Sequence, residues 1–125
     1  PMPDDSLRWS SPEVIIDGEY SKASDTWSFG VLIWEMFTLI DKDVDESNKG
    51  IIPYHQFTSK EQILSYLQKE KRLGKPNNCT DWLYEMMLRC WENSTHDRAK
   101  AHHIVRCIND KIPRDDHTSL ETDEG

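Results

Sequence analysis

The sequence has 125 residues, 36% of them hydrophobic and 30% charged, which suits one small globular domain. Its net charge is −8 with the histidines neutral. That charge argues against a nucleic-acid backbone as the main partner, because such binding needs clustered Lys and Arg. No apolar run approaches the roughly 20 residues that a membrane span requires. Three widely spaced cysteines without a CxxC pair predict reduced thiols, and neither a disulfide framework nor a zinc site.

The residues before position 40 predict two helices. A short turn of helix is expected at 11–17, with Pro12 tolerated in its first turn. The helix expected at 25–39 carries apolar side chains on every face. This pattern predicts burial on all sides and therefore a central place in a larger helical body. Ser24 is placed to cap the N-terminus of this helix.

Three more helices are expected, at 59–72, 80–91 and 100–111. The first begins with a capping box formed by Ser59 and Gln62, and it ends before Gly74. Its basic end favours either a solvated helix terminus or a docking surface for an acidic partner. The basic residues there are Lys69, Lys71, Arg72 and Lys75. The tryptophans predicted to lie in the core are Trp27, Trp34, Trp82 and Trp91.

Two segments lack helical periodicity. The acidic segment at 39–53 contains Asn48 and Gly50, which is typical of an exposed loop, here inserted between two helices. The acidic segment at 113–125 has no large apolar residue except Leu120, which predicts a disordered tail. We therefore expect a helical unit over residues 1–112 with one loop insertion, followed by the tail.

Three clusters of residues carry a family resemblance. They are Arg8-Trp9-Ser10-Ser11-Pro12-Glu13, then Ser24-Asp25-Thr26-Trp27-Ser28-Phe29-Gly30-Val31, then Leu88-Arg89-Cys90-Trp91 followed by Asp97-Arg98. In this order they resemble the last part of a protein-kinase catalytic domain, from the end of the activation segment to the last helix of the large lobe. The Arg8-Trp9 pair, the Trp-Glu-Met-Phe-Thr run and the Cys90-Trp91 pair resemble the tyrosine-kinase type.

This resemblance implies an all-α chain that forms the C-terminal lobe portion of the α+β protein-kinase-like fold. It implies a structural ion pair between Glu13 and Arg98, since an Arg fork can hold a carboxylate bidentately. Without the motif, both residues would be interpreted as ordinary surface charges. It also implies that Asp25 anchors the catalytic loop by accepting hydrogen bonds from backbone N–H groups. The helix dipole alone would favour an acidic residue at that position as well.

The same resemblance assigns Leu7, Arg8 and Trp9 to the substrate-binding loop. The sequence departs from the family here, because Ser6 stands where tyrosine kinases usually have Pro. Pro3 could supply that Pro only if residues 4–6 are an insertion. Ala99 likewise replaces the Pro that usually follows the last-helix Arg. The loop at 39–53 is longer than the usual link. These departures leave the substrate preference open.

The motifs that bind ATP and perform phosphoryl transfer do not occur in this sequence. It has no Gly-rich phosphate loop, no Val-Ala-Ile-Lys strand, no His-Arg-Asp catalytic loop and no Asp-Phe-Gly. We therefore expect no catalytic, cofactor-binding or metal-binding residue in this chain. ATP and Mg²⁺ would be bound by a complete parent kinase, with their sites upstream of Pro1. The chain is interpreted as a fragment or an incomplete gene model of such a kinase.

Two functions follow from the resemblance. The parent protein transfers the γ-phosphoryl group of ATP to tyrosine residues of protein substrates in signalling. Alternatively, it is a pseudokinase-like scaffold or protein-binding module. In both cases the upstream half of the kinase domain is the expected partner. The expected location is the cytoplasm, or the cytoplasmic face of the plasma membrane if the parent is a receptor.

Overall fold

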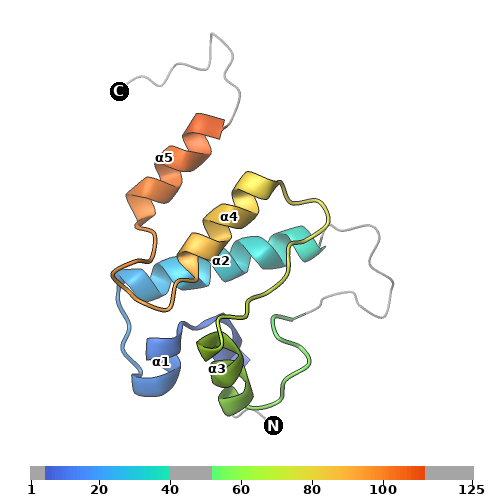
Figure 1. Ribbon diagram of the computed structural model, residues 1–125, viewed down its shortest axis with the longest axis vertical. Helices are drawn as coiled ribbons and strands as arrows, with labels where there is room; N and C mark the ends of the chain where they lie inside the picture. Colours follow the sequence, from blue (N-terminus) through green and yellow to red (C-terminus); the bar gives the residue numbers. More distant parts are fainter. Residues whose placement is uncertain (1–4, 40–51, 112–125) are drawn as a thin grey trace.

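The computed structural model describes residues 5–39 and 52–111, and every regular element within these ranges is a helix (Figure 1). The elements are η1 (Asp5–Trp9, a 3-10 helix), α1 (Pro12–Asp17), α2 (Lys22–Leu39), α3 (Lys60–Gln68), α4 (Asp81–Cys90) and α5 (Ala101–Lys111). The all-α expectation is confirmed for these residues. The insertion expected at 39–53 falls largely, and the tail at 113–125 wholly, outside the described residues.

Helix α2 occupies the middle of the molecule (Figure 1). Helix α4 packs along one side of it, and α1 and α3 lie on the other side. The core between these elements is made of fully buried side chains: Trp27 and Val31 from α2, Ile63 and Leu67 from α3, and Met87, Cys90 and Trp91 from the end of α4. Trp82 is an exception to the predicted core, because it is only half-buried.

The start of α2 differs from the prediction. The helix begins at Lys22, so Ser24 lies inside its first turn and is not the N-cap. Ser21 takes that place: its hydroxyl accepts a hydrogen bond from the backbone N–H of Ser24 at 3.2 Å. In return, the Ser24 hydroxyl accepts from the backbone N–H of Ser21 at 2.7 Å. This reciprocal pair works like a capping box, with a second Ser in place of the usual Glu or Gln.

Helix α3 begins as predicted but ends earlier than predicted. The predicted capping box of Ser59 and Gln62 is confirmed. At the other end, the helix stops at Gln68, several residues before the predicted end. Glu70 has a left-handed φ of 64°, and the N–H of the next residue, Lys71, donates to the carbonyl of Tyr66 at 3.1 Å. This is a Schellman motif with Glu in the position that usually holds glycine, so no glycine marks this end of the helix.

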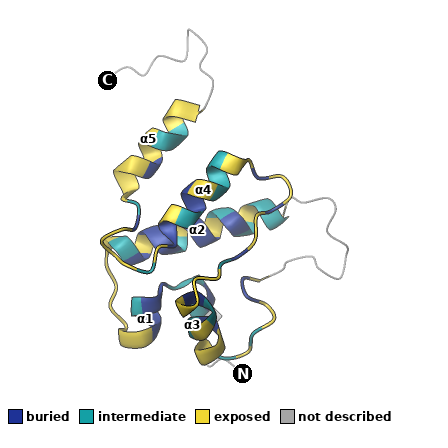
Figure 2. Ribbon diagram, viewed as in Figure 1, coloured by how far each residue is buried: buried dark blue, intermediate teal, exposed yellow. Residues whose placement is uncertain are grey.

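One face of α2 is not covered by the described residues. Buried and less buried positions alternate along this helix (Figure 2). Four large apolar side chains on this face are between 42% and 61% exposed: Phe29, Leu32, Met36 and Leu39. Their spacing of three and four residues places them on a single stripe along the helix. The predicted burial on all sides applies to the helix within a larger helical body, and the described residues cover only part of its surface. The apolar stripe needs a partner that the described residues do not supply.

Gly30 allows α2 and α4 to approach closely. A Cβ atom at this position would lie 2.8 Å from Nε1 of Trp91 and 2.9 Å from Cβ of Cys90, and both of these residues are fully buried. Such distances are too short for non-bonded atoms, so the helices would have to move apart. Glycine is needed here for packing rather than for an unusual backbone angle.

We predict that Gly30→Ala lowers the free energy of unfolding by about 1–3 kcal/mol, because overpacking outweighs the better helix propensity of Ala. Gly74→Ala is the matched control, since a Cβ there meets nothing within 4 Å. Urea unfolding of both variants would test the prediction. Equal stability of the two variants would contradict the close-approach argument.

Candidate functional site

The structure brings Glu13 and Arg98 together from distant parts of the chain. Glu13 lies in the first turn of α1, and Arg98 lies in the segment between α4 and α5. Nη1 of Arg98 donates to one carboxylate oxygen of Glu13 at 2.7 Å, and Nη2 donates to the other at 3.0 Å. The two groups therefore form a bidentate pair, which fixes orientation as well as distance.

The guanidinium of Arg98 also binds three backbone carbonyls. Nε donates to the carbonyl of Glu92 at 2.9 Å, and Nη2 donates to that of Asn93 at 3.2 Å. Nη1 donates to the carbonyl of Ala23, at the start of α2, at 3.1 Å. Arg98 is only 2% exposed, so its donors are satisfied almost entirely by protein atoms. One side chain thus joins α1, α2 and the segment after α4.

Trp27 lies beside this arginine and beside a second one. The guanidinium carbons of Arg98 and Arg72 lie 5.1 Å and 5.5 Å from the centre of the Trp27 ring, within the range of a cation–π contact. Nε of Arg72 also donates to the carbonyl of Trp91 at 2.8 Å. Arg72 is therefore part of the interior framework. Of the basic group predicted at the end of α3, the lysines alone are exposed.

The electrostatics of the pair favour its charged form. Burial is the largest single influence on the pKa of Glu13 and raises it, but the hydrogen bonds from Arg98 and from the backbone, together with the positive charge of Arg98, hold that pKa below its ordinary value of 4.5. A carboxylate held in this way keeps its charge at neutral pH and is engaged by a permanently charged partner. Its chemistry is that of a structural clamp, and it is poorly suited to transfer protons in a reaction.

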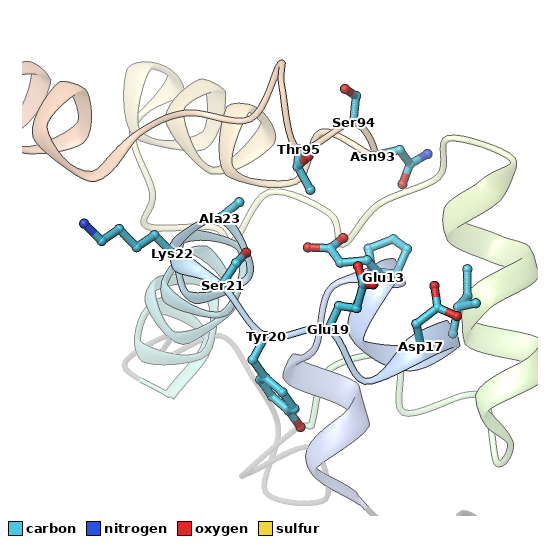
Figure 3. A pocket seen from close by; sticks show the side chains of 12 residues that line it. Glu13, Asp17, Glu19, Tyr20, Ser21, Lys22, Ala23, Asn93, Ser94 and Thr95 are labelled. Carbon is cyan, nitrogen blue, oxygen red and sulfur yellow. The ribbon is translucent and has the colours of Figure 1, made fainter.

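A cavity of about 970 Å³ opens beside the pair, between α1 and residues 93–95 (Figure 3). Its rim carries the side chains of Asp17, Glu19, Tyr20 and Lys22, while Glu13 lies within it. Over the described residues, no group of three or more His, Cys, Asp or Glu side chains could hold a metal ion. The acidic rim is therefore interpreted as a polar surface.

The residues assigned to the substrate-binding loop form η1. Arg8 is buried, and its guanidinium donates to the carbonyls of Tyr54 at 2.8 Å and Phe57 at 2.9 Å. Leu7 and Trp9 are half-buried against the core, and Nε1 of Trp9 donates to Glu35 in α2 at 3.1 Å. The side chain of Arg8 therefore stabilises the loop before α3. No sequence signal could have shown this, because its partners are backbone carbonyls.

Asp25 lies apart from the ion pair. Its carboxylate is exposed, and none of the described residues donates a hydrogen bond to it. It lines a largely apolar cavity of about 780 Å³ between α2 and α5, together with Phe29 and Ile104. The role of Asp25 as an anchor for the catalytic loop stays a prediction, because none of the described residues provides a donor to its carboxylate.

The buried thiol of Cys90 is not activated as a nucleophile. Burial raises the pKa of Cys90 to about 12, so its thiol stays protonated at neutral pH and is a poor nucleophile. Within residues 5–39 and 52–111, no helix combines the length and the apolar composition needed to cross a membrane. The Glu13–Arg98 clamp is therefore the best-defined polar site in this part of the chain.

We predict that Arg98→Ala lowers the free energy of unfolding by roughly 3–5 kcal/mol, because the change leaves a partly buried carboxylate without its partner. Arg98→Lys should fall between Ala and wild type, since Lys keeps the charge but cannot form the fork. The control is Lys75→Ala, which breaks the exposed 2.7 Å pair with Asp81 and should lower the stability far less, because water and salt screen an exposed pair. Urea unfolding measures all three. Similar costs for Arg98→Ala and Lys75→Ala would show that the buried clamp has no special role.

Comparison with known proteins agrees with this arrangement. The family described as protein tyrosine and serine/threonine kinase matches residues 3–108. The inactive tyrosine-protein kinase RYK of Caenorhabditis elegans is 40% identical over 104 residues, which are 83% of this chain and 16% of that protein. The insulin-like growth factor 1 receptor of Bos taurus is 37% identical over 106 residues, 85% of this chain and 15% of that protein.

Human inactive tyrosine-protein kinase 7 is 40% identical over 105 residues, which are 83% of this chain and 9% of that protein. This chain thus spans only a small part of each of these relatives. The match covers all three sequence clusters, and the fold brings these clusters together around Arg98. The chain belongs to the protein tyrosine and serine/threonine kinase family, as part of a tyrosine-kinase-type catalytic domain.

Proposed function

We propose that this chain is the C-terminal lobe segment of a tyrosine kinase whose complete form transfers the γ-phosphoryl group of ATP to protein tyrosines in signalling. The observation that carries the proposal is the set of contacts made by Arg98. It binds Glu13 of the first cluster, lies over Trp27 of the second, and itself follows the third. A general helical domain has no reason to join these three motifs.

In this proposal the chain contributes structural support to the catalytic domain and none of the reacting groups. Phosphoryl transfer depends on groups that cradle the phosphates, hold Mg²⁺ and orient the acceptor hydroxyl. The sequence contains none of the motifs that carry those groups. In the complete enzyme, the helices described here would form a rigid base, and the reacting groups would belong to the rest of the domain. Such a kinase works inside the cell, where ATP is available and cysteines stay reduced.

The apolar stripe on α2 is the proposed contact for the rest of the domain. Leu32 and Met36 at the middle of the stripe are 49% and 61% exposed, although they belong to the central helix. Asp25, on the same helix, presents a carboxylate with no donor among the described residues. An apolar strip next to an unpaired acceptor suits a partner that offers both apolar side chains and backbone N–H groups. A catalytic loop and its adjoining helix would have this chemistry.

A pseudokinase scaffold is the second candidate. Two of the relatives are described as inactive tyrosine-protein kinases, and their identity to this chain is as high as that of the receptor. Ser6 also departs from the usual substrate-loop sequence of tyrosine kinases. These observations concern the C-terminal lobe, whereas the groups that separate an enzyme from a scaffold are elsewhere in the domain. An active kinase and a pseudokinase scaffold would therefore share the helical arrangement described above.

The stripe gives a prediction that separates a domain segment from an independent domain. The isolated chain should bind a hydrophobic dye, and it should unfold at a higher temperature when it is joined to the upstream part of its own domain. Leu32→Gln should reduce dye binding in the isolated chain at little cost in stability. In the longer protein, the same change should lower the free energy of unfolding by roughly 2–5 kcal/mol.

Ile16→Gln is the matched control, because Ile16 is similarly exposed at 55% but lies on α1, away from the stripe. It should leave dye binding to the stripe of the isolated chain and the stability of the longer protein nearly unchanged. Equal effects of the two variants in the longer protein would remove the stripe as the contact. A sharp, reversible melt of the isolated chain without dye binding would show an independent domain instead.

Nucleotide binding and activity test the proposed function itself. Residues 1–125 should not bind ATP–Mg²⁺ and should not phosphorylate a tyrosine peptide. The complete protein should do both, and Arg98→Ala should reduce its activity by lowering the folded fraction. A complete protein that is well folded but shows no phosphoryl transfer would favour the scaffold. Saturable micromolar nucleotide binding by residues 1–125 alone would contradict both candidates.

A further inference from the structure

The four tyrosines of this chain differ sharply in how far their hydroxyl groups are available. Tyr54 is 2% exposed and lies in the core. The hydroxyls of Tyr66 and Tyr84 each donate to a backbone carbonyl, at 3.3 Å and 2.6 Å, and both rings are half-buried against the core. Tyr20 is 76% exposed, and none of the described residues forms a hydrogen bond with its hydroxyl.

The backbone around Tyr20 is also accessible. Residues 18–21 form no regular element, and they connect α1 to α2 at the surface (Figure 1). Gly18, with φ of 70°, ends α1 and turns the chain into this segment. Figure 3 shows the hydroxyl of Tyr20 pointing away from Glu13 and from the segment that carries Thr95. An enzyme could therefore engage this short connection without unfolding either helix.

The charge around Tyr20 is negative. Asp17 and Glu19 come just before it, both are exposed, and neither forms an ion pair among the described residues. Glu13 is also close along the chain, but its charge is paired with that of Arg98. Among the described residues, Lys22 is the one basic side chain that lines this cavity. An exposed acceptor preceded by acidic side chains suits an enzyme with a basic peptide groove, because such charge patterns guide the choice of substrate.

We propose that Tyr20 is an acceptor site for phosphorylation by a tyrosine kinase with a basic peptide groove, with ATP as the donor. Oη of Tyr20 attacks the γ-phosphorus of ATP, and an Oη–P bond forms. The bond from that phosphorus to the β–γ bridging oxygen breaks, and ADP leaves with its electron pair. The phenolic proton passes to a base of the phosphorylating enzyme. The product adds a charge of about −1.5 to −2 to a surface that is already acidic.

This proposal concerns the chain as a substrate, so it does not depend on whether its own domain is active. The test uses the complete protein, the catalytic domain of a separate active tyrosine kinase that prefers acidic peptides, and ATP–Mg²⁺. Mass spectrometry would map the phosphorylated residues. Treatment with a tyrosine phosphatase would check that the phosphate is on tyrosine. Within this chain, we expect rapid labelling at Tyr20 and little at Tyr54, Tyr66 or Tyr84. Tyr20→Phe should abolish phosphorylation within this chain and leave the melting temperature unchanged.

The charge argument has its own pair of variants. Asp17→Asn combined with Glu19→Gln should slow labelling of Tyr20 by roughly threefold or more, because it removes the charges that attract a basic groove. Glu85→Gln combined with Asp110→Asn removes two exposed charges from α4 and α5 and should leave the rate unchanged. The proposal is overturned if Tyr20 stays unlabelled, or if the buried tyrosines are labelled as fast. Equal rates for both double variants would overturn the part assigned to charge.

Discussion

A single buried guanidinium holds together three parts of the chain that are far apart in sequence. Arg98 binds the carboxylate of Glu13 and the carbonyls of Ala23, Glu92 and Asn93. Each of these acceptors is costly to leave without a partner once it is away from water. The arginine thereby constrains α1, which has six residues and is too short to be stable as an isolated helix. The placement of α1 relative to α2 depends on this contact.

The two sides of α2 have different roles. On one side, Gly30 lets the helix meet α4 at very short distance, and Trp27 lies between packed apolar groups and two guanidinium groups. On the other side, Phe29 and Met36 remain exposed. Packing is thus complete where the partners are within this chain, and incomplete where the family fold would supply other elements. A central helix that is packed on one side and exposed on the other is expected in a segment of a larger domain.

The sequence predicted best those features whose chemistry is local. The capping box at Ser59 is an example, because all its partners lie within one helical turn. The pairing of Glu13 with Arg98 could be expected from family resemblance alone, since nothing in the spacing of the two residues relates them. The inward turn of Arg8 could not be predicted, because its acceptors are backbone carbonyls of a distant loop. The early end of α3 was missed because Glu70 takes a conformation usually reserved for glycine.

The Glu13–Arg98 pair also constrains the order of events during synthesis. Its two members are separated by 85 positions, and ribosomes add about 5–20 residues per second. Glu13 therefore leaves the ribosome on the order of ten seconds before Arg98 can reach it. During that interval Glu13 in α1 lacks its ion-pair partner. The apolar residues of α2 stay unpacked until α4 has been synthesised. Slow translation before Arg98 would lengthen the time for which this apolar surface is exposed to water.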